Sequence, residues 1–259
     1  MLVILSPAKT LDESCATPPA PLTQPEFFSD AQSLAAQLQT LSEAQLASLM
    51  DISPKLAALN ASRYANFPKS LSEKNSRPAM FQFRGDVYEG FDIDSLPASA
   101  LPELQKRVRI LSGLYGLLRP LDLMYPYRLE MGTALKNPRG KDLYAFWGDR
   151  LTEALHRAAA QANTDILLNL ASNEYSKAVA RKGLKLQEIT VHFKEKKGNK
   201  LQVLGLFAKR ARGRMARFVV EQRIATPKAL QGFAEDGYRF DAALSDSANF
   251  TFVRAHPLV

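Results

Sequence analysis

Leu2-Val-Ile-Leu5 and Asp165-Ile-Leu-Leu-Asn-Leu-Ala171 are short, almost wholly apolar runs, and a polar segment follows each directly. The polar segments are Ser6-Pro-Ala-Lys-Thr10 and Ser172-Asn-Glu-Tyr-Ser-Lys177. Runs of this length and composition are typical of strands that are buried on both faces of a sheet. Because α/β proteins bind ligands at the carboxyl ends of such strands, we expect the two polar segments to face each other at one end of a sheet.

The rest of the chain mixes helical and strand patterns. Ser42-Glu-Ala-Gln45 is a capping box, and Ser53-Pro54 is a second helix start. Asp142–Ala160 has the apolar spacing of a long amphipathic helix, whereas Ala79–Phe83 alternates as a strand does. We therefore predict a mixed α/β fold in which residues 1–259 form a single compact domain, with a central mixed sheet flanked by helices.

Ile110–Gly132 has a composition that a packed core does not require. Gly113 and Gly116 interrupt an apolar run at its start. Polar residues then follow with neither helical nor strand spacing, namely Arg119, Tyr127, Arg128 and Glu130. Backbone freedom combined with hydrogen-bonding side chains is typical of binding loops. We interpret the stretch as one wall of a cleft, in which the two glycines permit close backbone approach to a phosphate.

Positive charge is concentrated in one part of the chain. The protein has a net charge of +8, but residues 177–223 alone contain fourteen Lys or Arg and three Glu, a balance of +11. Such asymmetry indicates one basic face and favours an anionic partner. A solvated, lysine-rich surface is the alternative interpretation.

The most basic part of this segment has helical spacing. Leu186–Phe193 and Leu201–Phe207 alternate as two strands joined by a glycine-asparagine turn, and Ala208–Arg223 follows as a predicted helix. Three arginines share one face of that helix, Arg210, Arg214 and Arg217. Because like charges at this spacing repel one another, we expect the helix to contact an anionic partner.

Composition excludes several classes of site and location. Cys15 is the only cysteine, and the three histidines, His156, His192 and His256, lack the spacing of a metal or haem site. We expect no cofactor and no stable metal site. The apolar start of the chain ends after five residues, and no apolar run approaches the roughly 20 residues that span a bilayer. We therefore expect a cytoplasmic monomer that does not bind membranes.

Motif blocks occur in order along nearly the whole chain: Ser6–Leu11, Gly85–Tyr88, Leu111–Gly116, Arg119–Met124, Pro126–Gly132, Gly140–Tyr144, Phe146–Gly148, Asn169–Ser172 with Glu174-Tyr175, and Ala211–Gly213. Taken together, they resemble the YaaA peroxide-stress family of bacteria. The resemblance implies a cytoplasmic protein that protects DNA during hydrogen peroxide stress and is associated with low intracellular free iron. It also implies a mixed α/β domain with a positively charged cleft, and a helix-hairpin-helix element linked to duplex DNA binding.

Two segments are candidates for the helix-hairpin-helix element. Leu111–Gly116 has two residues between its glycines, and Thr226–Phe233 combines a helix start with a turn at Gly232. Neither has the usual core of two glycines around one apolar residue, and we take the first as the candidate. The sequence has no iron ligand set, so we interpret any effect on iron as indirect.

Our first hypothesis is a DNA-binding protein of the peroxide response that grips duplex or distorted DNA through the basic cleft, without sequence specificity. Residues expected to contact nucleic acid are Lys9, Arg84, Gly113, Gly116, Arg119, Arg128, Lys209, Arg210, Arg212, Arg214 and Arg217. Roughly six to ten phosphate contacts predict a loss of affinity of about 10³–10⁵ between about 50 and 200 mM salt.

The alternative is an enzyme that acts on a nucleotide, base or damaged nucleic acid. Lysine, carboxylate and tyrosine side chains on converging loops supply a nucleophile, a general base and a stacking surface. The catalytic candidates are Lys9, Glu174 and Asp86, and the pocket candidates are Ser6, Thr10, Tyr88, Tyr127, Glu130, Asn173 and Tyr175. A basic scaffold that binds protein partners or RNA is a third interpretation.

Overall fold

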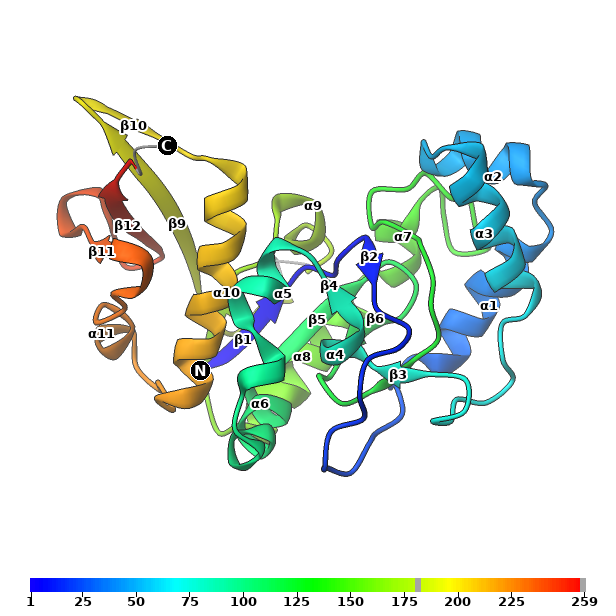
Figure 1. Ribbon diagram of the computed structural model, residues 1–259, viewed down its shortest axis with the longest axis horizontal. Helices are drawn as coiled ribbons and strands as arrows, with labels where there is room; N and C mark the ends of the chain where they lie inside the picture. The colour runs from blue at the N-terminus through cyan, green and yellow to red at the C-terminus, as the bar shows by residue number, and fades with distance from the viewer. Residues whose placement is uncertain (180–182, 257–259) are drawn as a thin grey trace.

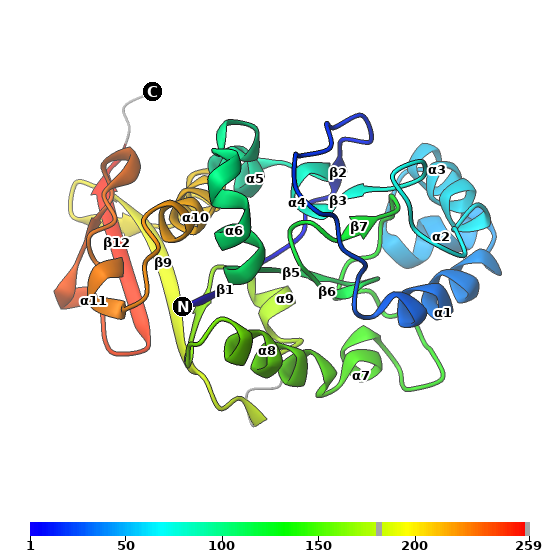
Figure 2. The same ribbon diagram turned by 90° about the horizontal axis from the view of Figure 1, so that it is seen from below.

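An eight-stranded mixed sheet runs through the centre of the computed structural model (Figures 1 and 2). The structure describes residues 1–179 and 183–256. The strand order is β11-β12-β9-β8-β1-β5-β6, and β10 pairs with β9. The strands are β1 Leu2–Leu5, β5 Val108–Ser112, β6 Gly116–Leu118, β8 Ile166–Asn169, β9 Gln187–Lys197, β10 Lys200–Gln202, β11 Arg239–Phe240 and β12 Asn249–Ala255. Neighbours from β12 to β5 are parallel, whereas β6, β10 and β11 pair antiparallel.

β1 and β8 lie in the middle of the sheet. β1 pairs with β5 on one side and with β8 on the other, so that Val3 lies opposite both Val108 and Leu168. Every side chain of β1 and of β8 is buried. Cover on both faces explains why these strands are apolar throughout instead of alternating. The predicted mixed α/β fold, with a central sheet flanked by helices, is confirmed.

Helices cover both faces of the sheet (Figure 2). One face carries α5 (Asp86–Phe91), α6 (Leu101–Arg107) and α10 (Gly205–Glu221), and the other carries α7 (Leu143–Trp147) and α8 (Arg150–Gln161). A separate group, α1 (Phe28–Gln39), α2 (Glu43–Met50) and α3 (Pro54–Ala65), lies at the end of the molecule opposite β11 and β12 (Figure 1). The predicted starts of α2 and α3 are confirmed by the capping bonds of Ser42 and Ser53.

Shorter elements connect these layers. The helical ones are α4 (Ala79–Gln82), α9 (Asn173–Ser176) and α11 (Pro227–Leu230), with 3₁₀ turns η1 (Ile93–Ser95), η2 (Ala98–Ala100), η4 (Glu235–Gly237) and η5 (Ala242–Leu244). Two small antiparallel pairs join β2 (Thr10–Leu11) to β4 (Phe83–Arg84) and β3 (Arg77–Pro78) to β7 (Leu123–Met124). The first pair anchors the loop after β1 to the start of α5.

Two predicted elements differ from the structure. Ala79–Phe83 is not a strand, because its first four residues form α4 and all four are buried. A short apolar run is compatible with either element, so the apparent alternation was misleading. Asp142–Ala160 is not one helix, since Gly148 separates α7 from α8 and has a φ of 50°, which favours glycine.

The basic segment is also divided differently from the prediction. The hairpin at residues 196–199 is confirmed by the antiparallel pairing of β9 and β10. Leu201–Phe207 is a strand only as far as Gln202, because α10 begins at Gly205. Residues 180–182, which the segment of high charge includes, lie outside the described residues.

Ile110–Gly132 contributes to the core, and the phosphate role predicted for its glycines is wrong. A Cβ on Gly113 would lie 2.2 Å from the carbonyl oxygen of Leu129, and a Cβ on Gly116 would lie 2.6 Å from the ring of Trp147. Both glycines are buried in the hairpin of β5 and β6. The close approach that they permit is therefore to protein atoms and not to a nucleic acid.

The preferred helix-hairpin-helix segment is also wrong. Leu111–Gly116 is a strand, a turn and the start of a second strand. In Thr226–Phe233, the glycine turn follows the four-residue helix α11, and the next described elements are η4 and β11. Neither candidate has an α-helix on each side of its glycines.

Gly213 allows α10 to pack against α5 at backbone distance, because a Cβ there would lie 1.8 Å from the carbonyl oxygen of Val87. We expect Gly213→Ala to lower the free energy of unfolding by about 2–3 kcal/mol or more, since the two helices must move apart. Urea denaturation followed by circular dichroism measures the change. Gly205→Ala, at the start of the same helix, is the matched control, because a Cβ there would have no neighbouring atom within 4 Å. It should change the free energy of unfolding by less than about 1 kcal/mol. Equal losses in the two variants would contradict this account.

Candidate functional site

A cleft of about 380 Å³ opens where β1 and β8 end, and we call it the β1–β8 cleft. The loops after these strands, the start of α5 and one side of α10 form its walls. The predicted site residues that line it are Ser6, Lys9, Thr10, Arg84, Asp86, Tyr88, Glu130, Glu174, Tyr175, Lys209 and Arg212. Its position at the carboxyl ends of parallel strands is where folds of this type bind ligands.

Hydrogen bonds hold the two strand-end loops together. The backbone amide of Ser172 donates to Oγ of Ser6 at 2.8 Å, and the two hydroxyl oxygens lie 3.3 Å apart. From α5, the hydroxyl of Tyr88 donates to the carbonyl oxygen of Ser6 at 2.9 Å. The two polar segments therefore meet, as the sequence predicts. Ser6 and Tyr88 serve here to position the backbone of the cleft.

Four basic side chains line the cleft, and three of them have carboxylate partners. The pairs, with their N–O distances, are Lys9–Glu130 (3.9 Å), Arg84–Asp12 (3.1 Å), Arg84–Asp94 (3.3 Å) and Lys209–Asp86 (3.6 Å). Partly exposed ion pairs of this kind contribute little to stability. They can therefore open at small cost when a stronger anion enters.

The fourth cation, Arg212, has no carboxylate or hydrogen-bond partner in the part of the chain that the structure describes. Its side chain is partly buried, and burial lowers the pKa of its guanidinium group. Arg212 also lines a neighbouring hollow of about 360 Å³, which contains the predicted pocket residue Asn173 together with Asn169 and Asn249. A partly buried guanidinium group without a counter-ion is suited to bind an anion.

Glu130 is the acid of the cleft whose ionisation is opposed by its surroundings. Burial raises its pKa, the positive charge of Lys9 opposes that shift, and the negative charge of Glu174 adds to it. Oε1 of Glu174 accepts a hydrogen bond from the backbone amide of Gly132 at 2.8 Å. Glu130 therefore lies beside Lys9, whereas Glu174 is held by the backbone.

Tyr127 and Arg128 lie beside the cleft instead of lining it. Both line a small hollow that also contains Lys9 and Glu130. The hydroxyl of Tyr127 hydrogen-bonds that of Ser112 at 2.6 Å, and burial raises its pKa. Tyr127 is thus a neutral core residue behind the cleft.

The three arginines on one face of α10 do not line the cleft and are paired with carboxylates. The pairs are Arg210–Glu89 (3.2 Å), Arg214–Asp236 (2.7 Å), Arg217–Asp92 (3.6 Å) and Arg217–Glu221 (2.9 Å). The prediction that repulsion on this face requires an external anion is therefore wrong. Glu89 lies 121 residues from Arg210, so no local pattern in the sequence reveals the pairing.

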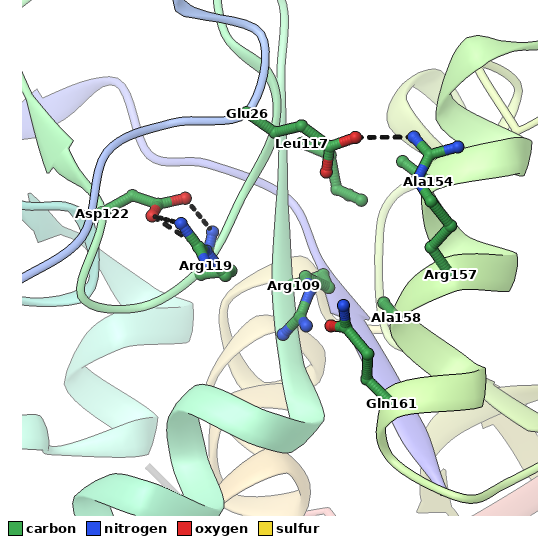
Figure 3. Close-up of a pocket in the computed structure, with 9 residues that line it drawn as sticks. All are labelled: Glu26, Arg109, Leu117, Arg119, Asp122, Ala154, Arg157, Ala158 and Gln161. Atoms are coloured by element: carbon green, nitrogen blue, oxygen red, sulfur yellow. Dashed lines mark hydrogen bonds and ion pairs between the residues drawn. The ribbon is translucent and has the colours of Figure 1, made fainter.

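Arg119 lies away from the cleft, in the hollow that Figure 3 shows between β6 and α8. Its backbone amide donates to Asp122 at 2.7 Å, and its Nε donates to the same carboxylate at 3.0 Å. Its predicted place on a cleft wall opposite Lys9 is wrong, because Arg119 follows β6 at the edge of the sheet.

Three further observations concern the thiol, metal binding and membrane-spanning helices. Cys15 is buried, and burial raises the pKa of its thiol to about 11. Within residues 1–179 and 183–256, no three His, Cys, Asp or Glu side chains form a group that could hold a metal ion. Among the helices of the same residues, none is long and apolar enough to cross a membrane.

The fold and the cleft define a class of protein, a mixed α/β domain with a charged cleft at the ends of two central parallel strands. A family model described as peroxide stress protein YaaA matches residues 1–244. A UPF0246 protein of Burkholderia multivorans is 52% identical over 256 residues, covering 98% of each chain. UPF0246 proteins of Hahella chejuensis and Shewanella baltica are 47% and 48% identical, covering 99% and 98% of this chain and the whole of each relative. The chain belongs to the YaaA peroxide stress protein family, as its motifs imply.

The raised pKa of Glu130 predicts how its replacement depends on pH. The folded protein holds this proton more tightly than the unfolded chain does, so ionisation costs stability as the pH rises above about 4, the usual pKa of glutamate. Glu130→Gln cannot ionise, and we expect it to gain stability relative to the wild type between about pH 4 and pH 7. Urea denaturation at several pH values measures the difference.

Glu73→Gln makes the same chemical change at an exposed position and is the control. The same pH dependence in both variants would show that burial in the cleft is not its cause.

Proposed function

We propose that the protein binds DNA through phosphate contacts in the β1–β8 cleft, without sequence specificity, as its part in the response to peroxide stress. The observation that carries the proposal is Arg212, a partly buried guanidinium group with no counter-ion among the described residues. A phosphate oxygen in the cleft would supply the missing charge-assisted hydrogen bonds. Any effect on free iron is then indirect.

The paired cations of the cleft support the same function. The side chain of Lys9 is 64% exposed and its carboxylate partner lies 3.9 Å away, so a phosphate can displace that contact. Displacing counter-ions in this way is the main source of affinity for a nucleic acid backbone. The cleft also contains Asp86, Glu130 and Glu174, which limit the number of phosphates that it can hold.

Replacing Arg212 tests phosphate binding in the cleft directly. We expect Arg212→Gln to weaken binding to all duplex sequences alike and to reduce the slope of log affinity against log salt by about 1, because one phosphate contact is lost. Fluorescence anisotropy with labelled duplexes at several salt concentrations measures both quantities.

Arg210→Gln is the matched control, since Arg210 lies on the same helix but is paired with Glu89 outside the cleft. Equal losses of DNA affinity in the two variants would show that DNA binds to the whole exposed surface of α10 and not to the cleft alone. An affinity of the wild type that does not depend on salt would rule out phosphate binding altogether.

The second candidate function is an enzyme that acts on a nucleotide, base or damaged nucleic acid in the same cleft. The observation that favours it is the contact of Lys9 with Glu130, an acid whose pKa is raised by burial. Acids perturbed in this way gather at catalytic sites. Glu130 replaces Glu174 as the favoured acid–base group, while Lys9 keeps its predicted role as nucleophile.

Single-turnover assays on oxidised and mismatched duplexes, and on the corresponding nucleotides, test this second function. Glu130→Gln should slow product formation by about 10²–10⁴-fold, the usual contribution of a general acid or base. DNA affinity should be retained or increased, because the variant removes a negative charge from the cleft. No product from the wild-type protein on any of these substrates would eliminate the enzyme hypothesis and leave the DNA-binding proposal in place.

A further inference from the structure

A separate hollow of about 340 Å³ lies between the sheet and α8, where β5 and β6 meet that helix (Figure 3). Its polar lining consists of Glu26, Arg109, Arg119, Asp122, Arg157 and Gln161. Three guanidinium groups therefore face two carboxylates. None of these residues lines the β1–β8 cleft.

Arg109 is the deepest of the three arginines, with only 5% of its surface exposed. Its Nη1 donates to the backbone carbonyls of Gln105 (2.9 Å), Lys106 (3.4 Å) and Val108 (2.7 Å). The guanidinium group thereby caps the C-terminal end of α6. Its Nε and Nη2 have no hydrogen-bond partner among the described residues, and neither atom is fully buried. The free N–H groups of a mostly buried guanidinium group are therefore accessible only from the hollow that Arg109 lines.

The register of β5 and β6 brings a second positive charge close to Arg109. Ile110 pairs with Leu118, so the next position along the two strands places Arg109 opposite Arg119 on the same face. Burial lowers the pKa of Arg109 to about 10, and the positive charge of Arg119 adds to this shift, whereas Asp122 and Glu26 oppose it. Like charges opposite each other on a sheet are destabilising, and Asp122 pairs with Arg119 but not with Arg109. An anion between the two arginines would reduce the remaining repulsion.

The carboxylates of the hollow are already engaged by other residues. Asp122 accepts hydrogen bonds from Arg119 and from the hydroxyl of Thr23. Glu26 is paired with Arg157 at 2.6 Å, at the solvent side of the hollow. Figure 3 shows these two pairs on either side of Arg109, which no carboxylate contacts.

Gln161 completes the arrangement. It is exposed at the end of α8, extends toward Arg109 in Figure 3, and has no hydrogen-bond partner in the described chain. Its side-chain amide can donate to an oxyanion that the guanidinium group of Arg109 also contacts.

We propose that this hollow binds an oxyanion of the phosphate class between Arg109 and Arg119, either as free phosphate or as the phosphate group of a small molecule. The volume is in the range of small-molecule sites and exceeds what a single phosphate fills. The ligand is not duplex DNA, because a side chain that is 95% buried is out of reach of a duplex backbone. The inference is independent of the function proposed for the β1–β8 cleft.

Titration calorimetry of the full chain with inorganic phosphate and with adenosine monophosphate tests the site. We expect both to bind the wild type, and tighter binding of the nucleotide would identify a small molecule as the carrier of the phosphate. Gln161→Glu places a carboxylate beside Arg109, so it should weaken binding of both probes by at least about tenfold, or about 1.4 kcal/mol. The position is exposed, and folding is checked by thermal denaturation.

Gln231→Glu is the matched control, because it makes the same change at an exposed position on the C-terminal side of α11. Binding of this variant should equal that of the wild type, and neither variant should lose affinity for DNA through the cleft. No binding of either probe by the wild type up to about 10 mM would overturn the proposal. Binding that Gln161→Glu leaves unchanged would also overturn it, because the anion would then lie elsewhere.

Discussion

The hydrogen bonding of β1 on both of its edges is the constraint on which the rest of the structure depends. β1 pairs with β5 and β8, and each of its side chains is buried, so the strand cannot shift without breaking two ladders and the core at once. The chain leaves the sheet at Leu5, and Ser6 is therefore fixed where it accepts the amide of Ser172. The cleft exists because these two strand ends cannot move apart.

Most of the arginines on α10 are paired with carboxylates, although the net charge of the protein is +8. Arg210 and Arg217 of α10 pair with carboxylates of α5 and of the residue after it, so the two helices combine backbone contact at Gly213 with ion pairs around it. Arg214 pairs with Asp236 of η4. Arg212 and Arg109 have no carboxylate partner among the described residues, and each lies in a hollow instead of on an open surface.

The parts of the fold that could be predicted from the sequence are those in which the cause is local. The apolar runs of β1 and β8, the capping box at Ser42 and the polar strand ends each carry their signal within a few residues. The ion pairs Arg210–Glu89 and Arg217–Asp92 join residues more than 120 positions apart, and a single sequence does not show which distant residues meet. The phosphate role predicted for Gly113 and Gly116 was wrong for a related reason. Close approach to Leu129 and Trp147 requires glycine just as close approach to a phosphate does.

Arg212 and Arg109, the two guanidinium groups without a carboxylate partner among the described residues, lie in separate hollows of the protein. Arg212 lies at the open cleft, whereas Arg109 is buried beneath α8, in the smaller hollow. α6 lies between them, since it accepts hydrogen bonds from Arg109 and packs against α10. Such a shared neighbour is a spatial link and not by itself an energetic coupling. Because different elements hold the two groups and different faces expose them, we expect the proposed anions to bind independently of each other.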